Sequence, residues 1–204
     1  SVLNARVKEC APFENVYTLA LRGLHDRAMN ASNDMGDRKD MLQEALMAQR
    51  QMLIDAIGKP GEEIPQAFTP YKEVLDVYDE GLELPDDLTI IWPDDNYGYM
   101  TRLSSPKEQK RSGRSGVYYH SSYLGKPHDH LWMNTISPTL MYEELRKAYD
   151  ATADRIWLLN AGDIKSCEFA VDYFLTMAFD IDSFNFERAA NYRTEWLCGM
   201  LGDQ

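Results

Sequence analysis

The segment at residues 92–99, Trp-Pro-Asp-Asp-Asn-Tyr-Gly-Tyr, brings together side chains of the kinds that a sugar-binding site uses. Its carboxylates and its amide accept and donate hydrogen bonds, and its aromatic rings offer flat apolar faces. The segment directly follows the apolar run 88–91, Leu-Thr-Ile-Ile, which has the composition of a β-strand. The sequence therefore predicts a polar, sugar-binding cluster at the end of a strand.

Two later segments repeat this design, with polar residues where a strand-like run stops. The run 116–123 carries His120 and Tyr123 near its end, and the run 156–163 carries Asn160. Polar residues that recur at the ends of β-segments are typical of a parallel sheet whose carboxyl-terminal face holds the site.

Charged side chains follow the earlier strand-like runs, namely Arg22, Asp26 and Glu73. Because the carboxyl ends of barrel strands meet at one face, we expect these residues to converge with the later ones. Carboxyl groups that face one pocket can hydrolyse a glycosidic bond, one as a protonated acid and the other as an ionised group. Burial and mutual repulsion would keep one of them protonated near neutral pH. Aromatic platforms for the sugar rings would come from Trp92, Tyr97, Tyr118, Tyr123 and Trp132.

Each of these residues also has a purely structural interpretation. Arg22 and Asp26 could form an ion pair at a strand end. Glu73 could stabilise the first turn of a helix through the helix dipole. His120 could be a hydrogen-bonded core histidine, and Asn160 could cap the helix that follows it.

The loop after the fourth predicted strand contains His128, Asp129 and His130. These residue types bind zinc, but a zinc site needs further ligands at suitable spacing, and the neighbouring residues offer none. A metal site is an alternative here, and we expect neither a metal nor a cofactor. The sequence also lacks the Gly-x-Ser-x-Gly motif of serine hydrolases and the Gly-x-Gly-x-x-Gly motif of dinucleotide-binding domains.

The elements that position these residues follow from the hydrophobic pattern. Apolar residues at helical spacing, closed by Gly58 and Pro60, predict a helix at 40–57. Ser137 and Pro138 have the residue types of a helix N-cap and first position. The full expectation is helices at 40–57, from 137 onward, at 167–179 and at 186–201, a short helix or turn at 72–78, and strands at 16–21, 64–71, 88–92, 116–123 and 155–160.

Five successive strand-helix units predict an α/β fold with a parallel sheet and right-handed crossovers. An eight-stranded barrel needs about 250 residues, whereas this chain has 204. We therefore predict a partial (β/α)8 TIM barrel of about five β/α units. Residues 1–204 would form a single domain fragment, the C-terminal part of a TIM-barrel catalytic domain, with the first strands upstream.

The composition excludes several kinds of partner. The chain has a net charge of −12 and is 44% hydrophobic, as expected for a globular protein with an acidic surface. Nucleic acids and anionic membranes require basic surfaces, so neither is expected as a partner. The basic cluster at residues 107–114 is expected to be a solvated loop or helix face. The three cysteines are too few and too far apart for a disulfide framework, so we expect reduced thiols.

Several of these segments resemble glycoside hydrolase family 115, the xylan α-1,2-glucuronidases. The matching runs are residues 90–103, 116–129, 131–132 and 156–165, and the segments 22–26 and 71–74 fit the family's other strand-end motifs. The resemblance covers roughly residues 16–182. It implies a (β/α)8 catalytic domain that removes glucuronic acid or its 4-O-methyl ether from xylan by inverting hydrolysis, without a metal.

The resemblance also implies roles for individual residues. Glu73 and Asp26 match the family's essential carboxylates, and we expect Glu73 to be the general acid and Asp26 to orient or activate the attacking water. An inverting enzyme would hold these two carboxyl groups about 6.5–9.5 Å apart. Arg22 and His120 would bind the uronate carboxylate. The residues that match the family's substrate pocket are Arg22, Asn96, His120, Tyr123 and Asn160.

Members of this family are much longer than this chain, so the predicted activity belongs to a parent enzyme, and the fragment is expected to be inactive alone. The expected partners are glucuronoxylan or branched xylo-oligosaccharides, and the parent enzyme could form a homodimer. A polysaccharide substrate indicates a secreted or periplasmic protein. Two alternatives are a non-catalytic glycan-binding relative and another TIM-barrel glycosidase with a different sugar specificity.

Overall fold

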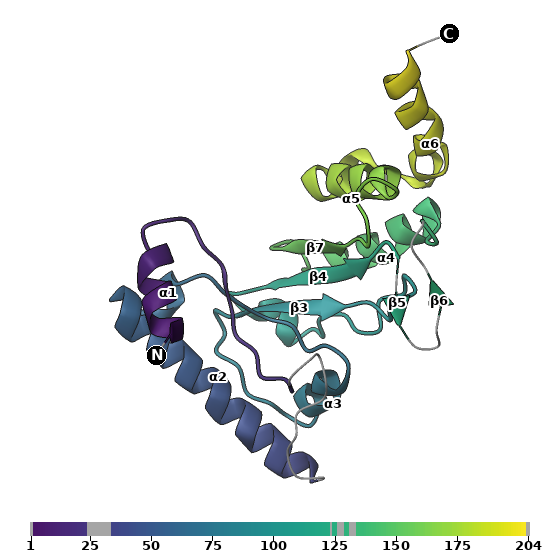
Figure 1. Ribbon diagram of the computed structural model, residues 1–204. Coiled ribbons are helices and arrows are strands. Elements are labelled where there is room, and N and C mark those ends of the chain that lie inside the picture. The colour runs from purple at the N-terminus through teal and green to yellow at the C-terminus, as the bar shows by residue number, and fades with distance from the viewer. Residues whose placement is uncertain (1, 24–33, 123, 126–128, 131–133, 203–204) are drawn as a thin grey trace. The chain divides into compact units, whose positions relative to one another are not determined.

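The computed structural model of the protein describes residues 2–23, 34–122, 124–125, 129–130 and 134–202 (Figure 1). Five strands form one sheet in the order β1-β2-β3-β4-β7. The β1–β2, β2–β3 and β4–β7 pairs run parallel, and helices lie between most of the strands along the chain. The predicted α/β class, with five strands in a parallel arrangement, is confirmed.

Contacts between residues divide the chain into two compact units. The first comprises Ser1–Ile91 and Lys110–Arg114, and the second comprises Trp92–Gln109 and Ser115–Gln204. The boundary falls within strand β3 (Thr89–Pro93). Each unit has its own hydrophobic core.

The first unit packs a long helix with short strands. Its elements are α1 (Val2–Cys10), β1 (Tyr17–Thr18), α2 (Met35–Ile57), η2 (Gly61–Glu63), β2 (Gln66–Phe68), α3 (Glu73–Asp79) and the start of β3. Helix α2 contacts α1, η2 and α3 (Figure 1). Its core consists of buried apolar side chains from these elements, among them Leu42, Leu46, Phe68, Val74 and Val77. Helix α1 is an addition to the predicted elements.

Helix α2 begins earlier than predicted because a polar cap starts it. The side chain of Asp34 accepts a hydrogen bond from the N–H of Asp37 at 3.2 Å. The apolar spacing alone placed the start near residue 40. The helix ends as predicted, with Gly58 in the left-handed conformation (φ 77°) and its N–H donating to the carbonyl of Ile54.

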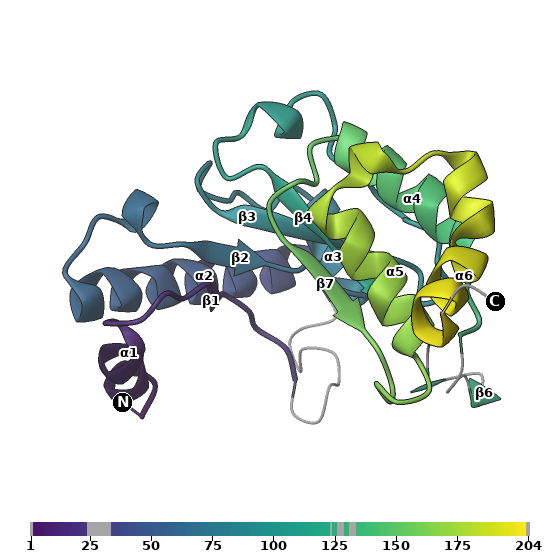
Figure 2. The same ribbon diagram turned by 90° about the horizontal axis from the view of Figure 1, so that it is seen from above.

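The second unit places three helices around the later strands. Its elements are the end of β3, η3 (Glu108–Lys110, in part), β4 (Ser115–His120), α4 (Pro138–Asp150), β7 (Trp157–Asn160), α5 (Glu168–Phe179), η4 (Ile181–Ser183) and α6 (Phe186–Leu201). Helix α4 packs on β4 and α5 packs on β7, and both contact α6 (Figure 2). The buried core includes Tyr119, Met141, Leu145, Phe174 and Met177.

A short antiparallel pair lies in a segment that the sequence predicted as a strand end and loop. Strands β5 (Leu124–Gly125) and β6 (Asp129–His130) pair with Leu124 opposite His130. Strand β4 accordingly ends at His120, earlier than the predicted residue 123. None of the described helices is long and apolar enough to cross a membrane.

The pairing of β4 with β7 depends on Gly116. A Cβ added to Gly116 would overlap the carbonyl oxygen of Ile156. That oxygen also accepts the N–H of Val117 at 2.9 Å, so neither backbone can move away without weakening the ladder. The same register places His120 opposite Asn160, so this glycine supports the alignment of two predicted site residues.

We expect Gly116→Ala to destabilise the protein by about 1–3 kcal/mol, the usual cost of inserting a methyl group into a well-packed region. The measurement is urea unfolding of the full-length protein. Gly199→Ala is the matched control, because Gly199 lies on α6 with nothing within 4 Å of an added Cβ, and alanine there favours the helix. Equal unfolding midpoints for the two variants would contradict the close approach of β4 and β7.

Candidate active site

Arg22 and Glu73, two of the predicted site residues, contact each other in the first unit. Arg22 follows β1, and Glu73 is the first residue of α3. The guanidinium donates from Nε to Glu73 Oε1 at 3.2 Å and from Nη2 to Oε2 at 3.3 Å. This is a bidentate, charge-assisted pair. The two side chains are 20% and 24% exposed, so a ligand can reach them.

The backbone directly before Glu73 has an unusual conformation. Lys72 has φ 53° and ψ −124°, a region that residues with a Cβ rarely adopt and that costs about 1–3 kcal/mol. The buried side chains of Val74 and Val77 anchor the helix that follows. Strain of this kind is found at functional sites, where the surrounding structure holds a residue in one position. Here the strained residue sets the position of Glu73.

We expect Lys72→Gly to raise the free energy of unfolding by about 1 kcal/mol, because glycine adopts positive φ without the steric cost of a Cβ. Urea unfolding of the full-length protein measures this gain. Lys59→Gly is the control: Lys59 is also exposed but is not at positive φ, so the change should be neutral or destabilising. A lower midpoint for Lys72→Gly than for the parent would show that Lys72 is not strained.

In the second unit, hydrogen bonds join the predicted residues Asn96, His120 and Asn160 to two neighbours, Asp94 and Tyr118. His120 Nδ1 lies 2.6 Å from Oδ1 of Asp94. Asn160 donates from Nδ2 to the hydroxyl of Tyr118 at 2.6 Å. The rings of Tyr118 and His120 are 4.8 Å apart between centroids. The ends of β3, β4 and β7 thus carry one polar network.

Asp94 is the centre of this network. Its side chain has no exposed surface. Besides the His120 ring, it accepts the backbone N–H of His120 at 3.0 Å through Oδ2 and the N–H of Asn96 at 3.0 Å through Oδ1. Asn96 has φ 72°, a left-handed conformation that asparagine tolerates. One buried carboxylate therefore holds both Asn96 and His120.

The loop after β3 is further held by its own polar groups. Asp95 Oδ1 accepts the N–H of Tyr97 at 2.8 Å and that of Tyr99 at 3.1 Å. The hydroxyl of Tyr119 donates to the carbonyl of Gly98 at 2.8 Å. Burial, together with the nearby negative charges, raises the pKa of Tyr119, so its hydroxyl remains a donor across the neutral range. The loop is consequently a fixed part of the site.

The prediction that Trp92 is a sugar platform is wrong. Trp92 is 0% exposed, its Nε1 donates to Ser104 Oγ at 2.8 Å, and the guanidinium of Arg102 lies 4.4 Å from its ring centroid. The apolar run of β3 extends into Trp92, so this residue belongs to the interior. Tyr97, by contrast, is 38% exposed as a residue and can contact a ligand.

Two predicted site residues, Asp26 and Tyr123, lie outside the described residues. The same holds for His128 and Trp132. Their roles therefore stay predictions. Among the side chains that the structure describes, no group of three or more His, Cys, Asp or Glu residues could hold a metal ion.

The purely structural interpretations of Glu73, His120 and Asn160 can be compared with the contacts that these residues make. Glu73 lies in the first turn of α3, as the helix-dipole interpretation requires, but it also pairs with Arg22. His120 is buried and hydrogen-bonded. Asn160 does not cap α5, whose N-cap is Cys167. The contacts of Glu73 and Asn160 thus go beyond the structural roles considered for them.

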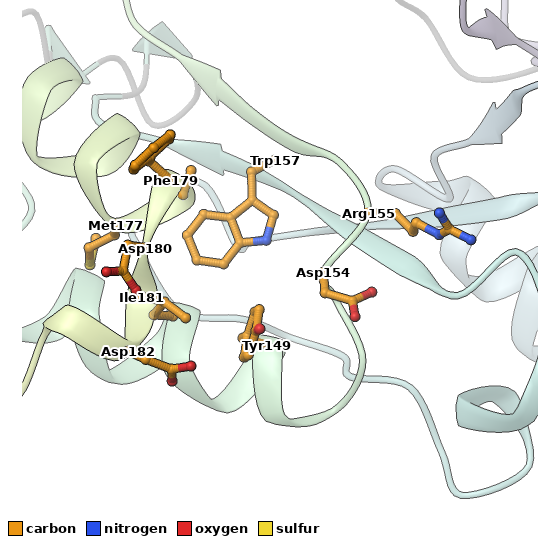
Figure 3. A pocket seen from close by; sticks show the side chains of 10 residues that line it. Tyr149, Asp154, Arg155, Trp157, Met177, Phe179, Asp180, Ile181 and Asp182 are labelled. Atoms are coloured by element: carbon orange, nitrogen blue, oxygen red, sulfur yellow. The ribbon is translucent and has the colours of Figure 1, made fainter.

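A pocket of about 410 Å³ lies at the start of β7, away from the predicted residues (Figure 3). Trp157, the first residue of this strand, lines the pocket, whereas Asn160 is the last. The acidic side chains there are engaged elsewhere: Asp180 accepts the N–H of Ser183, and Asp182 pairs with Arg146 at 2.7 Å. Because parallel α/β sheets bind ligands at the carboxyl ends of their strands, the pocket is not the candidate active site.

Asp94 belongs to the polar cluster predicted at residues 92–99, but the sequence assigned it no role of its own. Its signal is local, since an aspartate two residues before an asparagine at the end of a strand is suited to an Asx turn. The contact with the ring of His120, 26 residues away, has no local signature. The ring of Tyr118 was expected to be a platform for a sugar ring. The structure shows in addition that its hydroxyl accepts a hydrogen bond from Asn160.

Comparisons with known proteins give a matching family and similar solved structures. The sequence description of glycosyl hydrolase family 115 matches residues 1–204. A solved structure, described as a novel family GH115 4-O-methyl-alpha-glucuronidase, BtGH115A, with specificity for decorated arabinogalactans, is 42% identical with a TM-score of 0.90. The match covers 96% of this chain and 26% of that protein, so this chain spans about a quarter of the relative's length. A comparison with curated proteins gives no significant match.

Proposed function

This chain belongs to glycosyl hydrolase family 115, and we propose that it contributes the C-terminal part of a (β/α)8 catalytic domain to an enzyme that releases glucuronic acid or its 4-O-methyl ether from a polysaccharide. A closed barrel needs eight strands, and the described residues supply five strands of one sheet. The proposed activity therefore belongs to the full-length protein, and residues 1–204 alone would be inactive.

The observation that carries this proposal is the pair of Arg22 and Glu73. The guanidinium makes two parallel hydrogen bonds to a carboxylate, the arrangement with which it would bind the carboxylate of a uronic acid. A bound uronate would replace Glu73 at Arg22 and leave Glu73 available to the glycosidic oxygen. Glu73 is then the proposed general acid, and Asp26 is proposed to orient or activate the attacking water.

The network of Asn96, His120 and Asn160 in the second unit is proposed to bind sugar. Amide and imidazole groups at strand ends suit the hydroxyl groups and the carboxylate of a sugar acid. The network is held by the buried Asp94 and the half-buried Tyr118, which favours a fixed geometry over an adaptable one. Tyr123 is proposed to belong to this set.

Two polysaccharides are candidates for the substrate. We propose glucuronoxylan and its branched oligosaccharides, which the resemblance to xylan α-1,2-glucuronidases supports. The second candidate is a decorated arabinogalactan, because the solved relative with 42% identity is described with that specificity. Both would present a terminal uronic acid to the same residues. A polymeric substrate also favours a secreted or periplasmic enzyme.

The test is to incubate the full-length protein with glucuronoxylan, with decorated arabinogalactan and with the matching oligosaccharides, and to identify the released acid by chromatography. Early NMR spectra of the product would show the β-anomer if an α-linkage is hydrolysed with inversion. Tight binding by calorimetry without product after long incubation would replace this proposal with the glycan-binding alternative. Release of a neutral sugar alone would indicate another glycosidase specificity.

A further inference from the structure

Helix α4 carries a carboxylate on its buried face. Glu144 is 6% exposed and shares this face with the buried side chains of Met141 and Leu145. Because burying a carboxylate is costly, it must keep hydrogen-bond partners there. Oε1 of Glu144 accepts from Nζ of Lys147 at 2.8 Å, and Oε2 accepts the backbone N–H of Met100 at 2.9 Å. The burial of Glu144 is therefore tied to a residue 44 positions earlier in the chain.

Met100 closes the loop after β3, residues 94–100. The side chains of Asp94 and Asp95 accept three N–H groups of this loop. The N–H of Asp95 donates to the carbonyl of Tyr99 at 2.9 Å. Local bonds of this kind replace regular secondary structure in turns. They fix the internal shape of the 94–100 loop, whereas its position depends on bonds to other elements.

Bonds to two other elements hold the 94–100 loop in place. At its start, the N–H of Asp94 donates to the carbonyl of Tyr118 at 3.1 Å, and in its middle the hydroxyl of Tyr119 donates to the carbonyl of Gly98 at 2.8 Å. Both of these partners lie on β4. Glu144 holds the end of the loop and lies on α4 instead. The position of the loop thus depends on a helix as well as on the sheet.

We propose that Glu144 is a positioning residue of the active site: by accepting the N–H of Met100, it holds the 94–100 loop where Tyr97, which is 38% exposed, contacts a sugar ring. The inference rests on the proposed function, because it takes the loop to be part of the sugar-binding site. Its structural half, the anchoring of the loop by Glu144, does not depend on the reaction. The two halves can therefore be tested separately.

The first experiment measures kinetics of the full-length enzyme on a glucuronic-acid-substituted xylo-oligosaccharide. We expect Glu144→Met to raise KM about 10-fold and to leave kcat within about twofold, a change that corresponds to one lost hydrogen bond. Glu144→Gln keeps a carbonyl oxygen for the N–H of Met100 and should recover most of this loss. Glu143→Met is the matched control, because Glu143 pairs with Lys147 at 2.9 Å as Glu144 does at 2.8 Å, whereas Glu144 accepts the N–H of Met100.

A double variant separates positioning from a general structural role. Tyr97→Ala removes the ring that the loop presents, so adding Glu144→Met to it should raise KM by a smaller factor than in the parent. A general structural role predicts the same factor in both backgrounds, or a fall in kcat with KM unchanged. Either of these results would overturn the proposal, as would equal rises in KM for Glu143→Met and Glu144→Met.

The second experiment follows hydrogen exchange of the full-length protein by mass spectrometry, without substrate. Peptides that cover the 94–100 loop should exchange slowly in the parent and faster in Glu144→Met, with no change in Glu143→Met. Fast exchange in the parent, or unchanged exchange in Glu144→Met, would overturn the anchoring even if the enzyme releases uronic acid. If the parent neither cleaves nor binds the oligosaccharide, the proposed function fails together with the positioning role, while faster exchange in Glu144→Met would still establish the anchor.

Discussion

Glu73→Gln should lower kcat of the full-length enzyme by about 10²- to 10⁴-fold while the substrate still binds. Glutamine has nearly the same size and can accept a hydrogen bond from Arg22, but it has no proton to give to the leaving oxygen, and a positioned general acid contributes a factor of this size. Steady-state kinetics on a glucuronic-acid-substituted xylo-oligosaccharide measure the loss, and calorimetry measures the retained binding.

The leaving group provides a sharper version of this experiment. The nitrophenolate released from a nitrophenyl uronide is a good leaving group that needs no protonation. Glu73→Gln should therefore lose much less activity on this substrate than on the oligosaccharide. Asp76→Asn is the matched control, since Asp76 is an exposed carboxylate in the first turn of the same helix. It should leave kcat unchanged. Full activity of Glu73→Gln on the oligosaccharide would exclude Glu73 as the acid.

Arg22→Lys should lower kcat/KM on uronic-acid substrates by about 10- to 150-fold, chiefly through KM. A lysine keeps the positive charge but cannot form two parallel hydrogen bonds to a carboxylate, and a hydrogen bond to a charged group contributes about 1.5–3 kcal/mol. Kinetics on the acid and on the corresponding neutral glucoside test this. The ratio of kcat/KM for the acid to kcat/KM for the glucoside should be smaller in the variant than in the parent.

Arg50 offers a control of the same residue type in the same unit. Its guanidinium pairs with Asp87 at 2.8 Å and donates to Gln66 at 3.3 Å. Arg50→Lys should therefore change the unfolding midpoint but not the preference for the acid over the glucoside. If Arg22→Lys lowers stability and leaves the preference intact, the Arg22–Glu73 pair is structural and the uronate is bound elsewhere.

Much of the second unit could be predicted because local signals agreed with the fold. Ser137 and Pro138 placed the start of α4, which begins at Pro138. The helices at 167–179 and 186–201 were confirmed within one residue. The first of these segments is apolar nearly all round and the second is amphipathic, and long runs of either kind are typical of helices.

The first unit was predicted less well, and its short strands explain why. Strand β1 contains only Tyr17 and Thr18, within a predicted run of six residues, and β2 contains three residues, Gln66–Phe68. In these runs, buried apolar residues occur both inside the hydrogen-bonded strand and just outside it, as Leu19 and Ile64 do. Composition alone cannot separate these two cases, because the ladder is defined by hydrogen bonds to a neighbouring strand.

The sequence by itself determined the α/β class, the positions of the chemically capable residues at strand ends, and the turns that aspartate and glycine impose. These features depend on neighbours a few residues apart, and residue type and spacing encode them. Only the tertiary structure decided that Arg22 meets Glu73, 51 residues away, that Asp94 holds His120, and that Trp92 is interior. Such partners are chosen by strand register and side-chain packing, which arise when distant segments come together.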